Sequence, residues 1–149
     1  MNNQASRSSG AFWDSGYYCA ESVLLAIAES KGVHSPLIPR IATGFCSGVS
    51  RTGGMCGALS GAVMSINLVT GRSAPTDSLE ECYAITKEMI KQFEKRFGAI
   101  NCLQLLGCDV STEEGRRFYK ENHLTERCQY FVEEATSIAM SLLESIPGS

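Results

Sequence analysis

The chain of 149 residues lacks acidic side chains over a long internal stretch. No carboxylate occurs between Glu29 and Asp77, although the whole chain carries a net charge of -3. An anionic group bound by this stretch would meet no like charge from the neighbouring sequence. A buried pair of helices that excludes charge of either sign would leave the same pattern. The charged residues within the stretch are all basic, namely Lys31, Arg40, Arg51 and Arg72.

The sequence also has no cluster of basic residues and no long hydrocarbon-like run. Net acidity without clustered Lys and Arg argues against a nucleic-acid partner. Residues 52–71 are uncharged, but about half of them are Gly, Ser, Thr or Asn, so we expect a buried central helix and no membrane span. Residues 1–12 lack an apolar signal core, so we predict a disordered tail and a cytoplasmic protein.

No segment shows the alternating pattern of a strand, and helical periodicity dominates. We therefore predict an all-α fold, a single-domain helical bundle of about five to seven helices over residues 13–149, some of them short. The bundle also includes a short helix or pair of turns at residues 35–48. The other predicted helices cover residues 19–32, 55–71, 76–98, 101–107, 109–122 and 128–146.

The seven cysteines include no C-x-x-C pair, which argues against a thioredoxin-type site and a zinc-ribbon knuckle. No C-x-x-C-H occurs, so covalent haem attachment is not indicated. An odd number of cysteines also argues against a framework of paired disulfides. His34 and His123, the two histidines, have no partner motif, so we expect neither to act as a ligand or base.

Four of the cysteines fall at the predicted start of a helix, where free N–H groups and the helix dipole favour a thiolate. If these helix starts converge, they form a pocket of four thiolates. The remaining cysteines are a predicted core residue, Cys82, and two residues in turn-like stretches, Cys46 and Cys108. The four at helix starts are Cys19, Cys56, Cys102 and Cys128.

Four thiolates on helices suit an iron–sulfur cluster or a tetrahedral zinc ion. The alternative is that these cysteines are small buried hydrophobic residues. Gly54 and Gly57 flank Cys56 closely and would let backbone N–H groups approach a bound cluster. Gly57 and Gly61 are four residues apart, a spacing that lets a second helix approach. We therefore predict Gly54, Gly57 and Gly61 as cofactor-binding residues.

Four motifs carry a resemblance to a known family: "YYCAES", "CGALSG", "FGAINCLQLLGCD" and "RCQYFVEEA". Together they resemble the bacterial and archaeal family of redox-active proteins named for its C_GCAxxG_C_C pattern. The resemblance runs from about Tyr17 to Ala135, and "CGALSG" corresponds to the central motif. The order Cys56-Gly57-Ala58 departs from the Gly-Cys-Ala of the name. The other hallmark cysteines of the family map onto Cys19, Cys102 and Cys128.

The resemblance implies a small helical protein, associated with oxidoreductase or transporter systems, that holds a prosthetic group such as an iron–sulfur cluster. Our leading hypothesis is an electron-transfer accessory protein that serves a partner oxidoreductase or a transporter-associated protein. A second hypothesis is a thiol–disulfide protein that cycles two of the four cysteines, such as Cys19 with Cys56. A third is a zinc-stabilised or metal-free interaction domain. The small-residue helix face also permits a homodimer.

Overall fold

A computed structural model describes residues 2–147, in which one 3-10 helix and eight α-helices follow one another along the chain. No strand occurs in this part of the chain; a single isolated antiparallel bridge joins Met55 and Asn101. The predicted all-α, single-domain fold is confirmed, although the prediction of five to seven helices omitted α1 and α3. The elements are α1 (Asn2–Asp14), α2 (Cys19–Ser30), η1 (Arg40–Phe45), α3 (Cys46–Arg51), α4 (Gly57–Thr70), α5 (Glu80–Phe97), α6 (Cys102–Leu106), α7 (Glu113–Glu121) and α8 (Leu124–Glu144).

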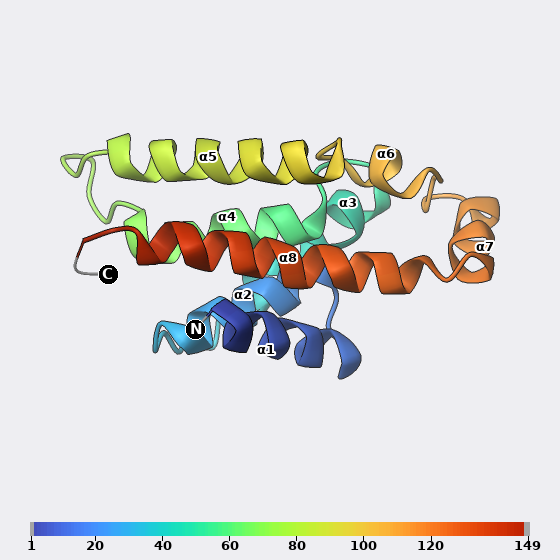
Figure 1. Cartoon of the computed structure of the whole chain (residues 1–149), viewed down its shortest axis with the longest axis horizontal. Coiled ribbons are helices and arrows are strands. Elements are labelled where there is room, and N and C mark those ends of the chain that lie inside the picture. Colours follow the sequence, from blue (N-terminus) through green and yellow to red (C-terminus); the bar gives the residue numbers. More distant parts are fainter. Residues whose placement is uncertain (1, 148–149) are drawn as a thin grey trace.

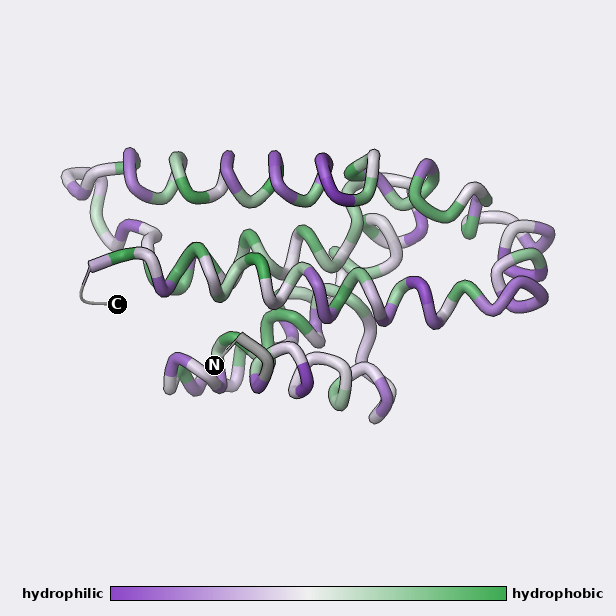
Figure 2. The backbone as a smooth tube through the Cα atoms, viewed as in Figure 1, coloured by the Kyte–Doolittle hydropathy of each residue, from purple (hydrophilic) through white to green (hydrophobic). Residues whose placement is uncertain are grey.

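Helix α4 lies at the centre of the bundle, in contact with α2, α5 and α8 (Figure 1). Helix α5 covers one side and α1 with α2 covers the other, while α3, α6 and α7 gather at one end. Figure 2 shows that hydrophilic residues lie mostly on the outer side of α5 and more hydrophobic ones on the side toward the bundle, as an amphipathic surface helix should. Its apolar face contributes Phe93, which packs on Phe131 of α8 inside the core.

Small side chains allow α4 to lie deep in the bundle. A Cβ atom added at Gly61 would lie 2.6 Å from the carbonyl oxygen of Ala20, so glycine permits close contact between α4 and α2. Ala58 and Ala62 of α4 are fully buried beside it. No helix among residues 2–147 is long and apolar enough to cross a membrane. Within the uncharged run over residues 52–71, the helix α4 is largely buried in the core, as expected.

The N-terminal segment differs from our prediction. We expected a disordered tail over residues 1–12, but from residue 2 onward the chain forms the helix α1, which packs against α8 and α2. Ala5 is only 3% exposed and Ser9 is fully buried. The Ser6 hydroxyl donates a hydrogen bond of 3.1 Å to the Glu133 carbonyl of α8. The small polar residues that led us to predict a disordered tail therefore pack closely against α8. Their hydroxyl groups donate hydrogen bonds to backbone carbonyls at this contact.

The segment α3 is a left-handed turn. Its residues Ser47 to Ser50 have φ between 56° and 65°, and Arg51 has φ 68°. Left-handed helix costs a non-glycine residue about 1–2 kcal/mol, so the surrounding structure must hold this turn. The Thr52 hydroxyl donates a hydrogen bond of 2.8 Å to the Val49 carbonyl, and the Gly54 N–H donates one of 2.8 Å to the Gly48 carbonyl. This turn forms part of the wall of the site described next.

Candidate functional site

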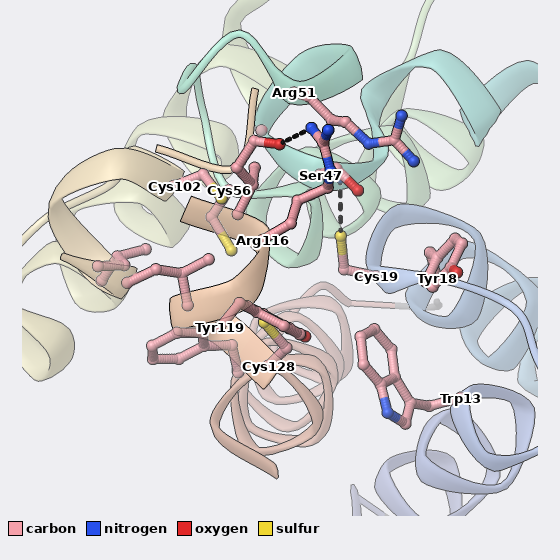
Figure 3. A pocket seen from close by; sticks show the side chains of 16 residues that line it. Trp13, Tyr18, Cys19, Ser47, Arg51, Cys56, Cys102, Arg116, Tyr119 and Cys128 are labelled. Carbon is pink, nitrogen blue, oxygen red and sulfur yellow. Dashed lines mark hydrogen bonds between the residues drawn. The ribbon is translucent and has the colours of Figure 1, made fainter. Parts of the chain in front are cut away.

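The four cysteines that the sequence singled out line one cavity of about 240 Å³ at the end of the bundle near α3, α6 and α7 (Figure 3). They come from four places in the chain: the start of α2, the residue before α4, the start of α6 and the second turn of α8. The structure thus brings together side chains separated by more than a hundred residues. The four are Cys19, Cys56, Cys102 and Cys128.

Cys56 and Cys102 are held side by side by a short backbone pairing. The Cys56 N–H donates to the Ile100 carbonyl at 2.8 Å, and the Cys102 N–H donates to the Gly54 carbonyl at 2.7 Å. These two bonds flank the bridge that joins the segments before α4 and α6. Asn101 then caps α6 by accepting a hydrogen bond of 2.8 Å from the Gln104 N–H. The pairing fixes where both helices begin and hence where both thiols lie.

Cys19 begins α2, whose start is stabilised by a hydrogen bond of 3.1 Å from the Tyr18 N–H to the Glu21 carboxylate. The backbone N–H of Ser47, in the left-handed turn, donates to Cys19 Sγ at 3.5 Å (Figure 3). A Cβ atom at Gly57 would overlap Cys19 Sγ, so this position leaves the room that the sulfur occupies. The left-handed turn and the start of α4 together place the Cys19 thiol.

Cys128 is not at a helix start, contrary to our expectation. Helix α8 begins at Leu124, after His123 adopts a left-handed conformation with φ 54°. Only two residues separate the end of α7 from the start of α8, so α8 begins one turn before Cys128. The Cys128 thiol instead lies beside the side chain of Tyr119 from α7 (Figure 3), and the two side chains shift each other's pKa. The helix-dipole argument therefore applies to three of the four cysteines and not to this one.

Burial raises the pKa of three of the four cavity thiols, which corrects the expectation of thiolates at helix starts for these three. Backbone N–H groups of Ala58 and Leu59 do lower the pKa of Cys56, but removal from water outweighs them and raises it to about 12. Burial also raises the pKa of Cys128 to about 11 and, in direction, that of Cys102. At neutral pH these three are neutral thiols in the protein without a ligand.

Two arginines border the cavity, and no carboxylate is among its lining residues. Arg51 follows the left-handed turn, and Arg116 of α7 donates a hydrogen bond of 2.9 Å to the Val110 carbonyl (Figure 3). Both side chains are exposed, which leaves their charges screened by water but available to an anionic group at the cavity mouth. The acid-free stretch of sequence thus corresponds to an acid-free cavity wall.

The three predicted glycines have different roles. Gly57 lines the cavity. Gly54 lies outside the lining, where its N–H and carbonyl tie the left-handed turn to Cys102. Gly61 also lies outside, against the backbone of Ala20. The geometry therefore places one of these glycines where it could face a cofactor, and the other two where they support the site.

The remaining three cysteines do not line the cavity. Cys46 is buried at 6% exposure, and its thiol donates a hydrogen bond of 3.8 Å to the Ala42 carbonyl. The neighbouring Cys19 side chain and burial raise the pKa of Cys46. Cys108 lies near enough to Cys102 to raise the pKa of the Cys102 thiol. Cys82 lies on α5, where its thiol donates to the Asn67 side-chain oxygen at 3.2 Å.

Sequence reasoning missed the aromatic residues of the site. Tyr119, whose pKa burial raises strongly, contacts Cys128, and Trp13 and Tyr18 border the cavity on the side of α1 and α2. No motif marks any of these positions, because each reaches the cavity only through the packing of its helix. Arg51 did carry a signal, as one of the four charged residues in the acid-free stretch.

The donor set of the cavity fits a metal–sulfur group. Thiolates are the ligands of iron–sulfur clusters and of structural zinc. The four thiols are distributed over the wall of a cavity many times larger than the ~10–15 Å³ that one water needs, so there is space for a group of several atoms. Among residues 2–147, no three His, Cys, Asp or Glu side chains already lie close enough to share a single metal ion.

Comparison with known proteins identifies one family. A family model described as "Putative redox-active protein (C_GCAxxG_C_C)" matches residues 17–142, most of the chain. The matched region contains all four cavity cysteines and every helix except α1 in whole or large part. No curated protein and no solved structure matches the chain.

Proposed function

The chain belongs to the C_GCAxxG_C_C family, whose name describes its members as redox-active, and from this premise we propose that it holds an iron–sulfur cluster and acts in electron transfer. The observation that carries the proposal is the convergence of four thiols on one cavity that also has two arginines and no carboxylate. The residues proposed to bind the cluster are Cys19, Cys56, Cys102 and Cys128.

The protein's own groups would support a bound anionic centre in three ways. The Ser47 N–H already donates to Cys19 Sγ, and the N–H groups of Ala58 and Leu59 point at Cys56. Such N–H···S bonds to ligating sulfurs are a known means of setting a reduction potential. Arg51 and Arg116 offset negative charge at the cavity mouth. The apolar wall limits access of water.

When bound, a cluster supplies reversible one-electron chemistry. The four thiols must each release a proton to bind it, since burial keeps at least three of them neutral at pH 7. The residues that line the cavity include no His, Asp, Glu or Lys that could act as a general base, so we assign the protein the role of a carrier. We propose that its partner is an oxidoreductase or a transporter-associated protein.

Replacement of one ligand tests the proposal. We expect wild-type protein purified without oxygen to contain iron and acid-labile sulfide and to absorb visible light. Cys56→Ser should lose this absorption and most of the iron and sulfide, because a serine hydroxyl is a poor substitute for a thiolate. Cys82→Ser should keep both, since Cys82 lies on α5 outside the cavity.

Far-UV circular dichroism of each variant distinguishes loss of ligand from loss of fold. Stoichiometric zinc without sulfide in the anaerobic wild-type protein would contradict the proposal and favour the structural-zinc hypothesis. A spectrum of Cys56→Ser identical to that of wild type would contradict the assignment of Cys56.

A further inference from the structure

One cysteine that the proposed cluster does not use lies directly behind one that it does. Cys46 ends the 3-10 helix and begins the left-handed turn, and it is buried in a small cluster with Ala20, Leu24 and Ala42. Cys19 packs against this same cluster while its sulfur faces the cavity. Among the four cavity cysteines, Cys19 is therefore the one that borders both the cavity and the small buried cluster around Cys46.

We propose that Cys19 and Cys46 form a reversible disulfide that controls whether Cys19 can bind the cofactor. The inference rests on the proposed function for its consequence, but the disulfide itself is a separate property of the chain. It is also a different pair from Cys19 with Cys56, the pair that sequence reasoning suggested.

Contacts at the two sulfurs support this pairing. Cys19 packs against the cluster that contains Cys46, and it is the neighbour with the largest effect on the pKa of Cys46, whose thiol donates a hydrogen bond of 3.8 Å to the Ala42 carbonyl. The residue after Cys46, Ser47, donates its N–H to Cys19 Sγ at 3.5 Å. A disulfide requires two cysteines whose side chains pack side by side, as these two do. The neighbours that influence Cys56, by contrast, are Cys128 and Cys102.

The two thiols differ in access, which suggests an order of events. Cys19 is partly exposed and lines the cavity, whereas Cys46 is buried at 6% exposure and does not line it. Cys19, as thiolate, would attack a low-molecular-weight disulfide, break its S–S bond and release one thiol. Cys46 would then attack the Cys19 sulfur and release the second thiol. The protein loses two electrons and two protons, and the small disulfide is reduced to two thiols.

The disulfide would remove a ligand without unfolding the site. A sulfur bonded to Cys46 carries no negative charge and cannot bind iron as a thiolate. The other three cavity cysteines have no role in the exchange, so a reductant would restore all four ligands. Oxidation would thus block cofactor uptake reversibly, because it removes Cys19 as a ligand.

The tryptic peptides of this chain suit a direct test. Cleavage after Lys and Arg places Cys19 in residues 8–31, Cys46 in residues 41–51 and Cys56 in residues 52–72, each the single cysteine of its peptide. After cluster-free protein is treated with glutathione disulfide, mass spectrometry without reduction should find 8–31 linked to 41–51. In Cys46→Ser, Cys19 should instead retain one glutathione, because the resolving thiol is missing. Cys82→Ser should behave as wild type.

Cofactor uptake from iron and sulfide under reducing conditions completes the test. The oxidised wild-type protein should lose most of its uptake and regain it after reduction, while reduced Cys46→Ser should take up as much as wild type. A link from 8–31 to 52–72, or no link at all, would overturn the inference while uptake by reduced protein still supported the proposed function. If the 8–31 to 41–51 link forms but reduced wild-type protein takes up nothing, the proposed function fails and the disulfide remains.

Discussion

Burial, neighbouring sulfurs, Tyr119 and Arg127 exert opposing influences on the pKa of the Cys128 thiol. Burial in the cavity wall raises its pKa, and the nearby sulfurs of Cys102 and Cys108 raise it further. The hydrogen bond from Tyr119 and the positive charge of Arg127 lower it. The net result is a pKa of about 11, because the cost of removing a thiolate from water is the largest of these effects. Position on a helix is thus a poor guide to the reactivity of this cysteine.

Alkylation kinetics should report this shift. Only the thiolate reacts, so the rate at Cys128 in cluster-free, reduced protein should be low at pH 7 and rise about tenfold per pH unit up to about pH 10. Peptide 128–149 contains Cys128 as its one cysteine, so tryptic mapping measures its rate directly. Tyr119→Phe removes a hydrogen bond that favours the thiolate and should slow the reaction further. A rate at Cys128 that is flat between pH 7 and 9 would contradict the raised pKa.

At the scale of elements, the left-handed turn α3 forms one wall of the site at a cost in backbone strain. Val49 has φ 58° and ψ 77°, a conformation that a β-branched residue rarely adopts. The turn nevertheless forms, because its carbonyls accept bonds from Thr52 and Gly54 and its Ser47 N–H faces Cys19. Strain of this kind is held where the surrounding contacts define the backbone completely.

Substitution within the turn should reveal the strain. Val49→Gly should raise the free energy of unfolding by about 0.5–1 kcal/mol, since glycine adopts this conformation readily and the valine side chain is 36% exposed. Gly48→Ala, one residue earlier, should lower it, because its new Cβ would overlap Cys102. Urea denaturation of the cluster-free proteins measures both. A loss of stability in Val49→Gly would show that the turn is not strained at this residue.

At the scale of the whole molecule, helix α1 connects the N-terminal segment to the site. It packs along α8 and α2, and its Trp13 borders the cavity. Arg96 and Glu134 form an ion pair between α5 and α8 on another side of α8. Helix α8 is therefore covered by α1, α2, α4 and α5, and the position of Cys128 depends on all of them.

A charge placed under α1 should destabilise the protein. Ala5→Glu would bury a carboxylate against α8, where Ala5 is 3% exposed, and should lower the free energy of unfolding by about 2 kcal/mol or more. Gln4→Glu adds the same charge at an exposed position of the same helix and should change stability little. Thermal unfolding of both variants compares them. Equal stability of the two would mean that α1 is not docked in solution.

Local patterns explain why most of the helices could be predicted. The periodicity that buries Met89 and Phe93 of α5 is present in any window of that segment, and Gly98 ends the helix with φ 85° as a C-terminal glycine should. Helix α1 could not be predicted in this way. Its buried face consists of Ala5, Ser9 and Gly10, small residues that become core only because α8 lies close to them.

The sequence by itself determined the all-α class, most of the helices and the four cysteines that line the cavity, because helix periodicity and residue identity are local properties. The tertiary structure alone decided that Cys46 lies behind Cys19 and that Tyr119 lies beside Cys128. It also decided that three of the four cavity thiols, those of Cys56, Cys102 and Cys128, are neutral. Proximity and burial depend on residues far apart in the chain, and the cost of desolvating a thiolate is set by all the atoms that surround it.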